Sequence, residues 1–204
     1  MSQKHQEDLS HIRSMMERSS RFISLSGLSG VFAGLTALGG SFYVYQLFKQ
    51  KGIEYFDGNQ RVYSYELIIE LVVVALFILA LALLFGIFFT LRKSKQNNLP
   101  VWTNTTKKML LNLAIPLCVG GVFCIALLYH HLFALIAPAT LLFYGLALVN
   151  AENYTFSDIK YLGICEIVLG CISLFYLGYG LVFWSIGFGI LHILYGVIMF
   201  KKYK

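Results

Sequence analysis

Six apolar stretches divide this chain, and each one is long enough to cross a lipid bilayer as a helix. They cover residues 23–48, 67–91, 109–129, 132–149, 161–177 and 181–200. A spanning helix needs about 20 mainly apolar residues, with a usual range of about 17–25. Only 13% of the residues are charged, whereas a soluble domain carries about 25%. The sequence therefore predicts an all-α integral membrane protein with six transmembrane helices.

A polar segment of residues 1–22 precedes the predicted transmembrane domain of residues 23–200. Within it, Leu9, Ile12 and Phe22 recur with a methionine at three- to four-residue steps, and charged side chains lie between them. This spacing predicts a short amphipathic helix that lies on the membrane surface or extends the first span. Residues 201–204 form a basic tail.

The distribution of basic residues predicts the orientation of the six spans. Thirteen of the sixteen lysines and arginines fall on one predicted side, and only Lys49, Lys51 and Arg61 fall on the other. Because cytoplasmic loops carry the excess of basic residues, both termini are expected in the cytoplasm. The basic residues flank apolar blocks, so they indicate membrane orientation and not a nucleic-acid partner.

The first span is rich in small residues. Ser26, Gly30, Gly34 and Ala37 follow one another at three- and four-residue steps. Small residues at this spacing let neighbouring helices approach closely in a membrane. We therefore expect this helix either to be central in the bundle or to present its small-residue face to a second copy or a partner membrane subunit.

Two ionisable residues lie within the last two spans, Glu166 and His192. Such residues are rare and costly inside a membrane, and each one is a functional hypothesis by default. At about 1.5 Å per residue the two side chains have similar depths, so contact between them is expected. The pair would either carry a proton or bind a ligand, or form a structural hydrogen bond between two helices.

Glu66 and Glu70 lie one turn apart at the outer end of the second span. Paired carboxylates can bind a cation or share a proton. A solvated acid, or one paired with a basic neighbour such as Arg61 or Lys49, is the less costly alternative, and we favour it. Of the two, Glu70 is the candidate for a ligand- or proton-linked role, because it lies deeper in the span.

An enzymatic alternative rests on the string Gly27-Leu28-Ser29-Gly30. It resembles the GxSG string of rhomboid intramembrane proteases, which also have a histidine on the sixth helix, as His192 is here. The enzymatic alternative uses His192 and Glu166 as acid and base, with Ser29 as the candidate nucleophile. The string lies on the first span here and not on the fourth as in that family, so its structural context differs. We expect no metal and no cofactor, because the four cysteines lie in apolar blocks without CxxC spacing and only one histidine lies at mid-membrane depth.

The stretch HIRSMMERSSRFISLSGLSG, residues 11–30, together with the six-helix plan, resembles a family of small bacterial inner-membrane proteins. That resemblance implies a multi-pass protein of the bacterial cytoplasmic membrane and carries no activity. The topology is also similar to that of the substrate-binding subunits of energy-coupling-factor vitamin transporters. We expect a non-enzymatic transport, ligand-binding or accessory component, with an intramembrane enzyme and a structural or oligomerising subunit as the alternatives.

Overall fold

The computed structural model describes residues 26–53 and 63–203. The predicted amphipathic helix of residues 1–22 lies outside this part of the chain. Every regular element in the described residues is helical, so the all-α prediction is confirmed there.

The first three long helices are α2 (Gly27–Gln50), α3 (Tyr65–Gln96) and α4 (Asn104–Tyr129). Local polar groups fix where α3 and α4 begin. The Ser64 hydroxyl accepts a hydrogen bond from the Leu67 amide, and Thr103 and Thr106 form a reciprocal capping box. These bonds satisfy amide groups that a helix N-terminus otherwise leaves unpaired. α3 extends past its predicted span at both ends and α4 at its start, because polar residues there continue the helices beyond the apolar stretches.

The C-terminal half contains α5 (Ile136–Ala151) and α6 (Ile159–Ser173), followed by a last helix in three parts. Its parts are α7 (Gly180–Trp184), a π-helical segment η4 (Ser185–Leu191) and α8 (His192–Lys202). Short 3₁₀ turns join the helices: η1 (Phe133–Leu135), η2 (Glu152–Tyr154) and η3 (Leu177–Tyr179). Because these turns are short, α4, α5 and α6 pack as antiparallel neighbours.

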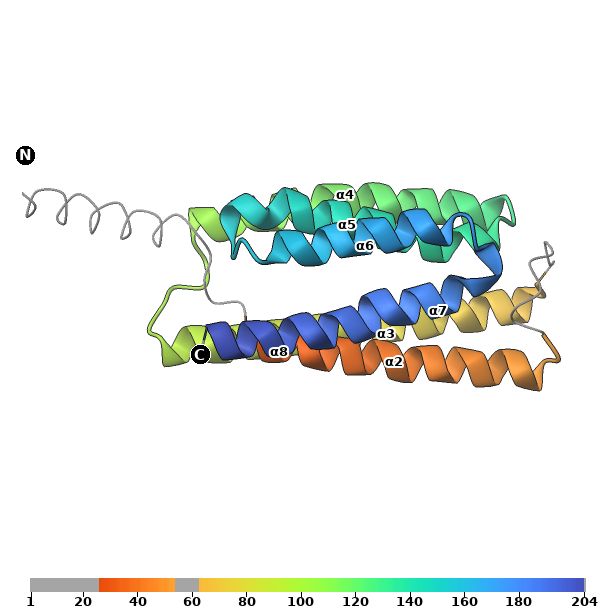
Figure 1. Cartoon of the computed structure of the whole chain (residues 1–204), viewed down its shortest axis with the longest axis horizontal. Coiled ribbons are helices and arrows are strands. Elements are labelled where there is room, and N and C mark those ends of the chain that lie inside the picture. The colour runs from red at the N-terminus through yellow and green to blue at the C-terminus, as the bar shows by residue number, and fades with distance from the viewer. Residues whose placement is uncertain (1–25, 54–62, 204) are drawn as a thin grey trace, which may run out of the picture.

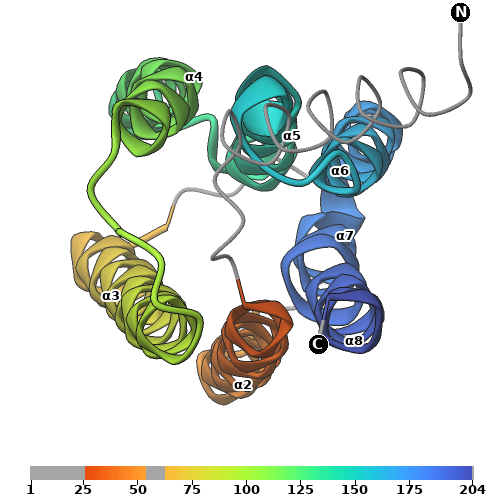
Figure 2. The ribbon, with the colours of Figure 1, turned by 90° about the vertical axis from the view of Figure 1, so that its left-hand side faces the viewer.

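The helices form a ring and not a bundle around a central helix. Figure 1 shows α4, α5 and α6 in one layer and α2, α3 and the α7–α8 helix in the other. Viewed end-on in Figure 2, neighbours around the ring follow the chain order, and α8 packs against α2. The expectation that the first span is central is therefore wrong: α2 is one wall of the ring.

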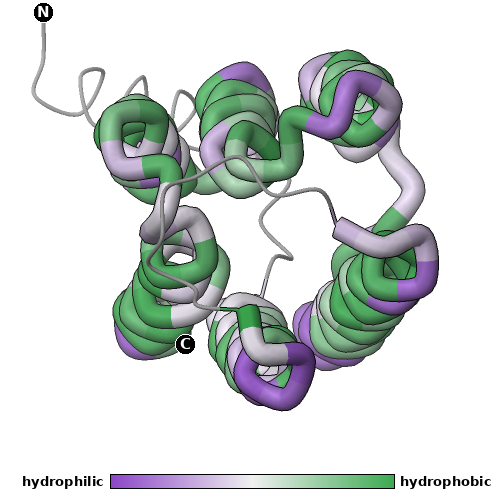
Figure 3. Tube along the Cα trace, turned by 90° about the vertical axis from the view of Figure 1, so that its right-hand side faces the viewer, coloured by the Kyte–Doolittle hydropathy of each residue, from purple (hydrophilic) through white to green (hydrophobic). Residues whose placement is uncertain are grey.

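The outer surface of this ring is apolar. Many large hydrophobic side chains are exposed on it, among them Leu84, Phe88 and Val122, each more than half exposed. In Figure 3, much of the tube is coloured as hydrophobic. Exposed apolar area on this scale is typical of a surface that contacts lipid and not water. Five described helices are long and apolar enough to cross a membrane, and α6, at 15 residues, is shorter. The chain is therefore helical, with the helix lengths and the apolar surface that are typical of a membrane protein.

The small residues of α2 bring its backbone against that of the last helix, at η4 and at α8. A Cβ atom built on Gly27 would lie 2.3 Å from the Gly196 carbonyl oxygen, and one on Gly34 would lie 2.6 Å from the Gly189 carbonyl oxygen. Only glycine fits at such a distance, so the small-residue pattern is used within the chain. The prediction that this face also binds a second copy or a partner subunit stays a prediction.

Candidate functional site

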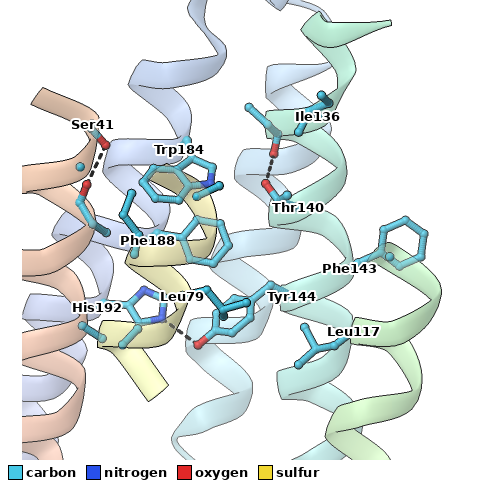
Figure 4. Close-up of a pocket in the computed structure, with 18 of the residues that line it drawn as sticks. Ser41, Leu79, Leu117, Ile136, Thr140, Phe143, Tyr144, Trp184, Phe188 and His192 are labelled. Atoms are coloured by element: carbon cyan, nitrogen blue, oxygen red, sulfur yellow. Dashed lines mark hydrogen bonds between the residues drawn. The ribbon is translucent and has the colours of Figure 1, made fainter. Parts of the chain in front are cut away.

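A cavity of about 920 Å³ occupies the centre of the ring. Every long helix contributes to its wall, and most of the wall is aliphatic or aromatic. The hydroxyl groups of Ser41 and Thr140 belong to the wall but donate to carbonyl groups of their own helices, those of Ala37 and Ala137 (Figure 4). Ligand pockets in proteins have volumes of roughly 300–1,000 Å³ with a few polar groups in an apolar lining. The cavity has both properties.

An aromatic row on the last helix faces this cavity, made of Trp184, Phe188 and His192 (Figure 4). The ring centroids of Trp184 and Phe188 lie 5.0 Å apart, and those of Phe188 and His192 lie 5.8 Å apart. The π-helical segment lies between the first and last members of the row. π-helical turns are rare and are found frequently at functional sites. It places residues four positions apart along one face.

Two glycines on either side of Phe188 let the π-helical segment fit between its neighbours. A Cβ atom on Gly187 would lie 2.5 Å from Glu166 Oε2, and one on Gly189 would lie 2.4 Å from a methyl group of Leu38. Thus α6 packs against one side of the segment and α2 against the other, while Phe188 points into the cavity. The sequence Gly-Phe-Gly is the local reason that the row can form.

Glu166, His192 and Tyr144 make a buried chain that ends at the cavity wall. His192 Nδ1 lies 3.4 Å from Glu166 Oε1 and 3.0 Å from the Gly187 carbonyl oxygen. On the other side of the ring, His192 Nε2 lies 2.8 Å from the Tyr144 hydroxyl (Figure 4). Glu166 is fully buried on α6, and His192 is 6% exposed. The predicted contact between these two residues is therefore present.

The partners of His192 determine which nitrogen carries its hydrogen. Nδ1 faces two acceptors, the carboxylate and the Gly187 carbonyl, so this nitrogen is the donor. In the neutral ring Nε2 then accepts from the Tyr144 hydroxyl. Glu166 has only the 3.4 Å ion-pair contact, and its two oxygens make no hydrogen bond among the described residues. Proton uptake at Glu166 would therefore change the contact that Glu166 makes with His192 and, through His192, the hydrogen bond to Tyr144.

The other two candidate residues lie elsewhere. Ser29 lines the cavity, but its hydroxyl donates to the Ser26 carbonyl, and His192 is already engaged by Tyr144 and Gly187. The structure therefore does not bring Ser29 and His192 together as a nucleophile and its base. Within the described residues, no group of three or more histidine, cysteine or acidic side chains could hold a metal ion.

Glu70 lies on the outside of the α2–α3 contact. Its carboxylate accepts a hydrogen bond from Tyr43 at 3.1 Å and pairs with Lys51 at 3.6 Å, and both residues of the ion pair are about one-third exposed. It is not part of the cavity wall. Glu70 is therefore a partly exposed acid paired with a basic neighbour, as in the alternative to a ligand- or proton-linked role.

A polar cluster ties the helix ends together at the same end of the ring as the C-terminus. Asp158 accepts hydrogen bonds from Lys202 at 2.8 Å and from the Tyr203 hydroxyl at 2.7 Å, while Lys93 of α3 donates to the Tyr203 carbonyl. Burial by itself would raise the pKa of Asp158, but the bonds from Lys202 and Tyr203 and the charge of Lys202 outweigh it and lower that pKa. The carboxylate is therefore charged at neutral pH and stabilises this end.

Sequence reasoning missed Tyr144, Gly187 and Tyr195 as members of the site. Tyr144 bonds His192, and the buried Tyr195 hydroxyl has no hydrogen bond among the described residues. One signal was available: the pairs Tyr144-Gly145 and Tyr195-Gly196 coincide when the chain is shifted by 51 residues. In both pairs the tyrosine lines the cavity, and the glycine lies against the backbone of a neighbouring helix.

These features define a helical protein with five candidate membrane-spanning helices among its described residues, a central apolar cavity and a buried Glu–His–Tyr chain on the cavity wall. Comparison of the chain with known protein families, with curated proteins and with solved structures found no match.

Proposed function

We propose that this protein is a non-enzymatic ligand-binding or transport component of a membrane, and that its central cavity holds the ligand. The observation that carries the proposal is the cavity itself, about 920 Å³ bounded by all the long helices. Dry bundles of this size pack to the density of organic crystals, with few voids larger than a water molecule. A cavity this large inside a ring of helices stabilises nothing by itself, so a bound molecule is the simplest reason for it.

The chemistry of the wall supports an apolar ligand whose binding is linked to a proton. Most of the wall offers only dispersion contacts, whereas His192 and Tyr144 offer polar atoms at one level of it. Glu166 lies behind them, out of reach of the cavity. A change in the charge of Glu166 would alter the hydrogen bond that Tyr144 gives to His192, and with it the polar surface that the ligand meets.

Substitutions that fill the cavity test this function. Gly86 and Gly121 line the cavity, and a Cβ atom on either meets no atom within 4 Å, so Gly86→Phe and Gly121→Phe can enter it without disturbing the ring. Native mass spectrometry of the wild-type protein, released from a mild detergent, should show one bound molecule per chain. We expect both variants to lose most of this bound mass.

Gly39→Phe is the matched control, because Gly39 is also free of neighbours within 4 Å but lies on the exposed face of α2 and outside the cavity wall. It should keep the bound molecule. A wild-type protein without bound mass, or equal occupancy in all four proteins, would contradict the proposed function.

The proposal includes six spans in a bacterial cytoplasmic membrane with both termini inside. It is supported by the excess of basic residues at the end of the ring where α3 and α8 end and α4 begins, and by the position of α6 in the ring beside α5. A fluorescent protein that folds only in the cytoplasm should be bright when fused after Tyr154 or after Tyr203 and dark when fused after Tyr179. If α6 did not cross, the fusions after Tyr154 and Tyr179 would lie on the same side of the membrane and give the same result.

A further inference from the structure

The ring has one weakly packed joint, which we call the α3–α4 seam. Around the ring, α2 packs against α3 and α8, and α5 packs against α4 and α6, but α3 and α4 make hardly any contact with each other. The buried residues of α3 are Leu67 and Ser94, near its two ends, and no residue between them is buried. Figure 2 shows the two helices joined at one end by the connection of residues 97–103.

The cavity reaches the outside along this seam. Leu76, Leu79 and Leu83 of α3 line the cavity and are nevertheless more than half exposed. Across the seam, Gly121 of α4 also lines the cavity and is exposed. Side chains that belong to both the cavity wall and the outer surface mark an opening, and here the outer surface is the apolar one that faces lipid.

The shape of the cavity fits a long, flexible chain. Its wall on α3 runs from Ile68 to Thr90, which at 1.5 Å per residue is about 33 Å. That length is close to the roughly 30 Å thickness of the hydrocarbon core of a bilayer. A volume of about 920 Å³ spread over this length makes a narrow cavity along the membrane normal and not a round pocket.

Basic side chains flank the seam where α3 ends and α4 begins. Four of them are exposed: Arg92, Lys95, Lys107 and Lys108. The acidic residues described at this end are already paired, Asp158 with Lys202 and Glu152 with Lys160. Basic groups between transmembrane helices at the membrane surface bind anionic lipid headgroups.

Together, the open seam, the narrow apolar cavity and the basic residues at its end point to one ligand class. We propose that the cavity takes up an acyl chain of an anionic phospholipid from the bilayer through the α3–α4 seam, with the phosphate held by the four basic residues. This inference rests on the proposed function and names its ligand. The route from the lipid phase needs no opening to water.

Photolabelling with defined lipids tests it. The full-length protein is placed in vesicles of phosphatidylcholine and phosphatidylglycerol. In one preparation a small fraction of the phosphatidylcholine carries a diazirine in the middle of its acyl chain, and in a second preparation the same fraction of the phosphatidylglycerol carries it. After illumination, labelled peptides are mapped by mass spectrometry. Tyr144 and Phe188 report the cavity, and Phe42, 63% exposed on α2 and outside the cavity wall, reports bulk lipid in the same molecule.

We expect labelling at Tyr144 and Phe188, relative to Phe42, to be at least about fivefold stronger from the phosphatidylglycerol probe, since each basic contact contributes about that factor. Changing Arg92, Lys95, Lys107 and Lys108 to glutamine should remove the preference but not the labelling of Phe42. Gly121→Phe should suppress cavity labelling by both probes, and Gly39→Phe should not.

Each other outcome overturns the inference in a recognisable way. Equal cavity labelling by the two probes would mean that the basic residues only orient the protein in the membrane. Labelling of Phe42 alone, with a bound non-lipid molecule in native mass spectrometry, would leave the proposed function intact and remove the phospholipid. Labelling of Phe42 alone without any bound mass would remove both.

Discussion

Alanine at Gly27 or at Gly196 should lower the free energy of unfolding by about 1–3 kcal/mol, the usual cost of overpacking a closely packed contact. The Cβ atom of an alanine at position 27 would lie 2.3 Å from both the Gly196 carbonyl oxygen and the Phe200 amide nitrogen. One at position 196 would lie 2.6 Å from the Gly27 carbonyl oxygen. These are backbone atoms, so relief requires the whole of α2 and α8 to separate.

Gly39→Ala and Gly121→Ala are the matched controls, because their Cβ atoms meet nothing within 4 Å. Each should leave stability unchanged or raise it by up to about 1 kcal/mol through the higher helix propensity of alanine. Reversible unfolding of the purified protein in mixed micelles, followed by circular dichroism, measures all four. A cost at position 39 equal to that at position 27 would show that the loss does not come from the α2–α8 contact.

His192→Ala should be much more costly than Glu166→Leu, although each removes one member of the same pair. Without His192 the fully buried Glu166 loses the one polar contact that its carboxyl group makes among the described residues, and leaving such a group unpaired costs about 1–3 kcal/mol, or more where the group is charged. Without Glu166, His192 keeps its bonds to Tyr144 and Gly187. Glu166→Leu therefore leaves no ring nitrogen of His192 without a partner and costs little.

The double variant Glu166→Leu/His192→Ala completes this cycle. Since no carboxylate remains unpaired in it, we expect it to recover most of the stability that His192→Ala loses, as measured by the same unfolding assay. Ligand occupancy measured against pH then separates structure from function: Glu166→Gln should flatten a pH dependence that the wild-type protein shows. If Glu166→Leu were the costlier single change, His192 would depend on Glu166 more than Glu166 depends on His192, which contradicts the prediction.

Much of the architecture was readable from the chain because lipid imposes simple rules. Long uncharged stretches can satisfy their backbone groups in a bilayer only as helices, so the all-α membrane class follows directly from the apolar blocks. The contact of Glu166 with His192 was also predictable. A short connection makes their helices antiparallel neighbours, and similar depths along these helices place the two side chains at the same level. The glycine spacing of residues 27–34 likewise predicted a close helix contact.

The partner of that contact was not predictable, because glycine spacing says how near a helix can come and not which one. The ring arrangement depends on pairing between α2 and α8, about 160 residues apart, and nothing local in either segment encodes it. Tyr144 was missed for a related reason. A tyrosine in an apolar stretch is an ordinary interfacial residue until a histidine on another helix faces it.

Thus the sequence by itself determined the class of protein, the positions of the helices and the identity of the buried ionisable pair, because each depends on the cost of placing charge or unpaired backbone in lipid. Only the tertiary structure decided that the helices surround a cavity, that the π-helical segment Ser185–Leu191 directs Phe188 into it, and that α3 and α4 leave a seam. These features depend on how closely side chains from distant segments pack between the helices, and this packing is defined only when all the helices are in place.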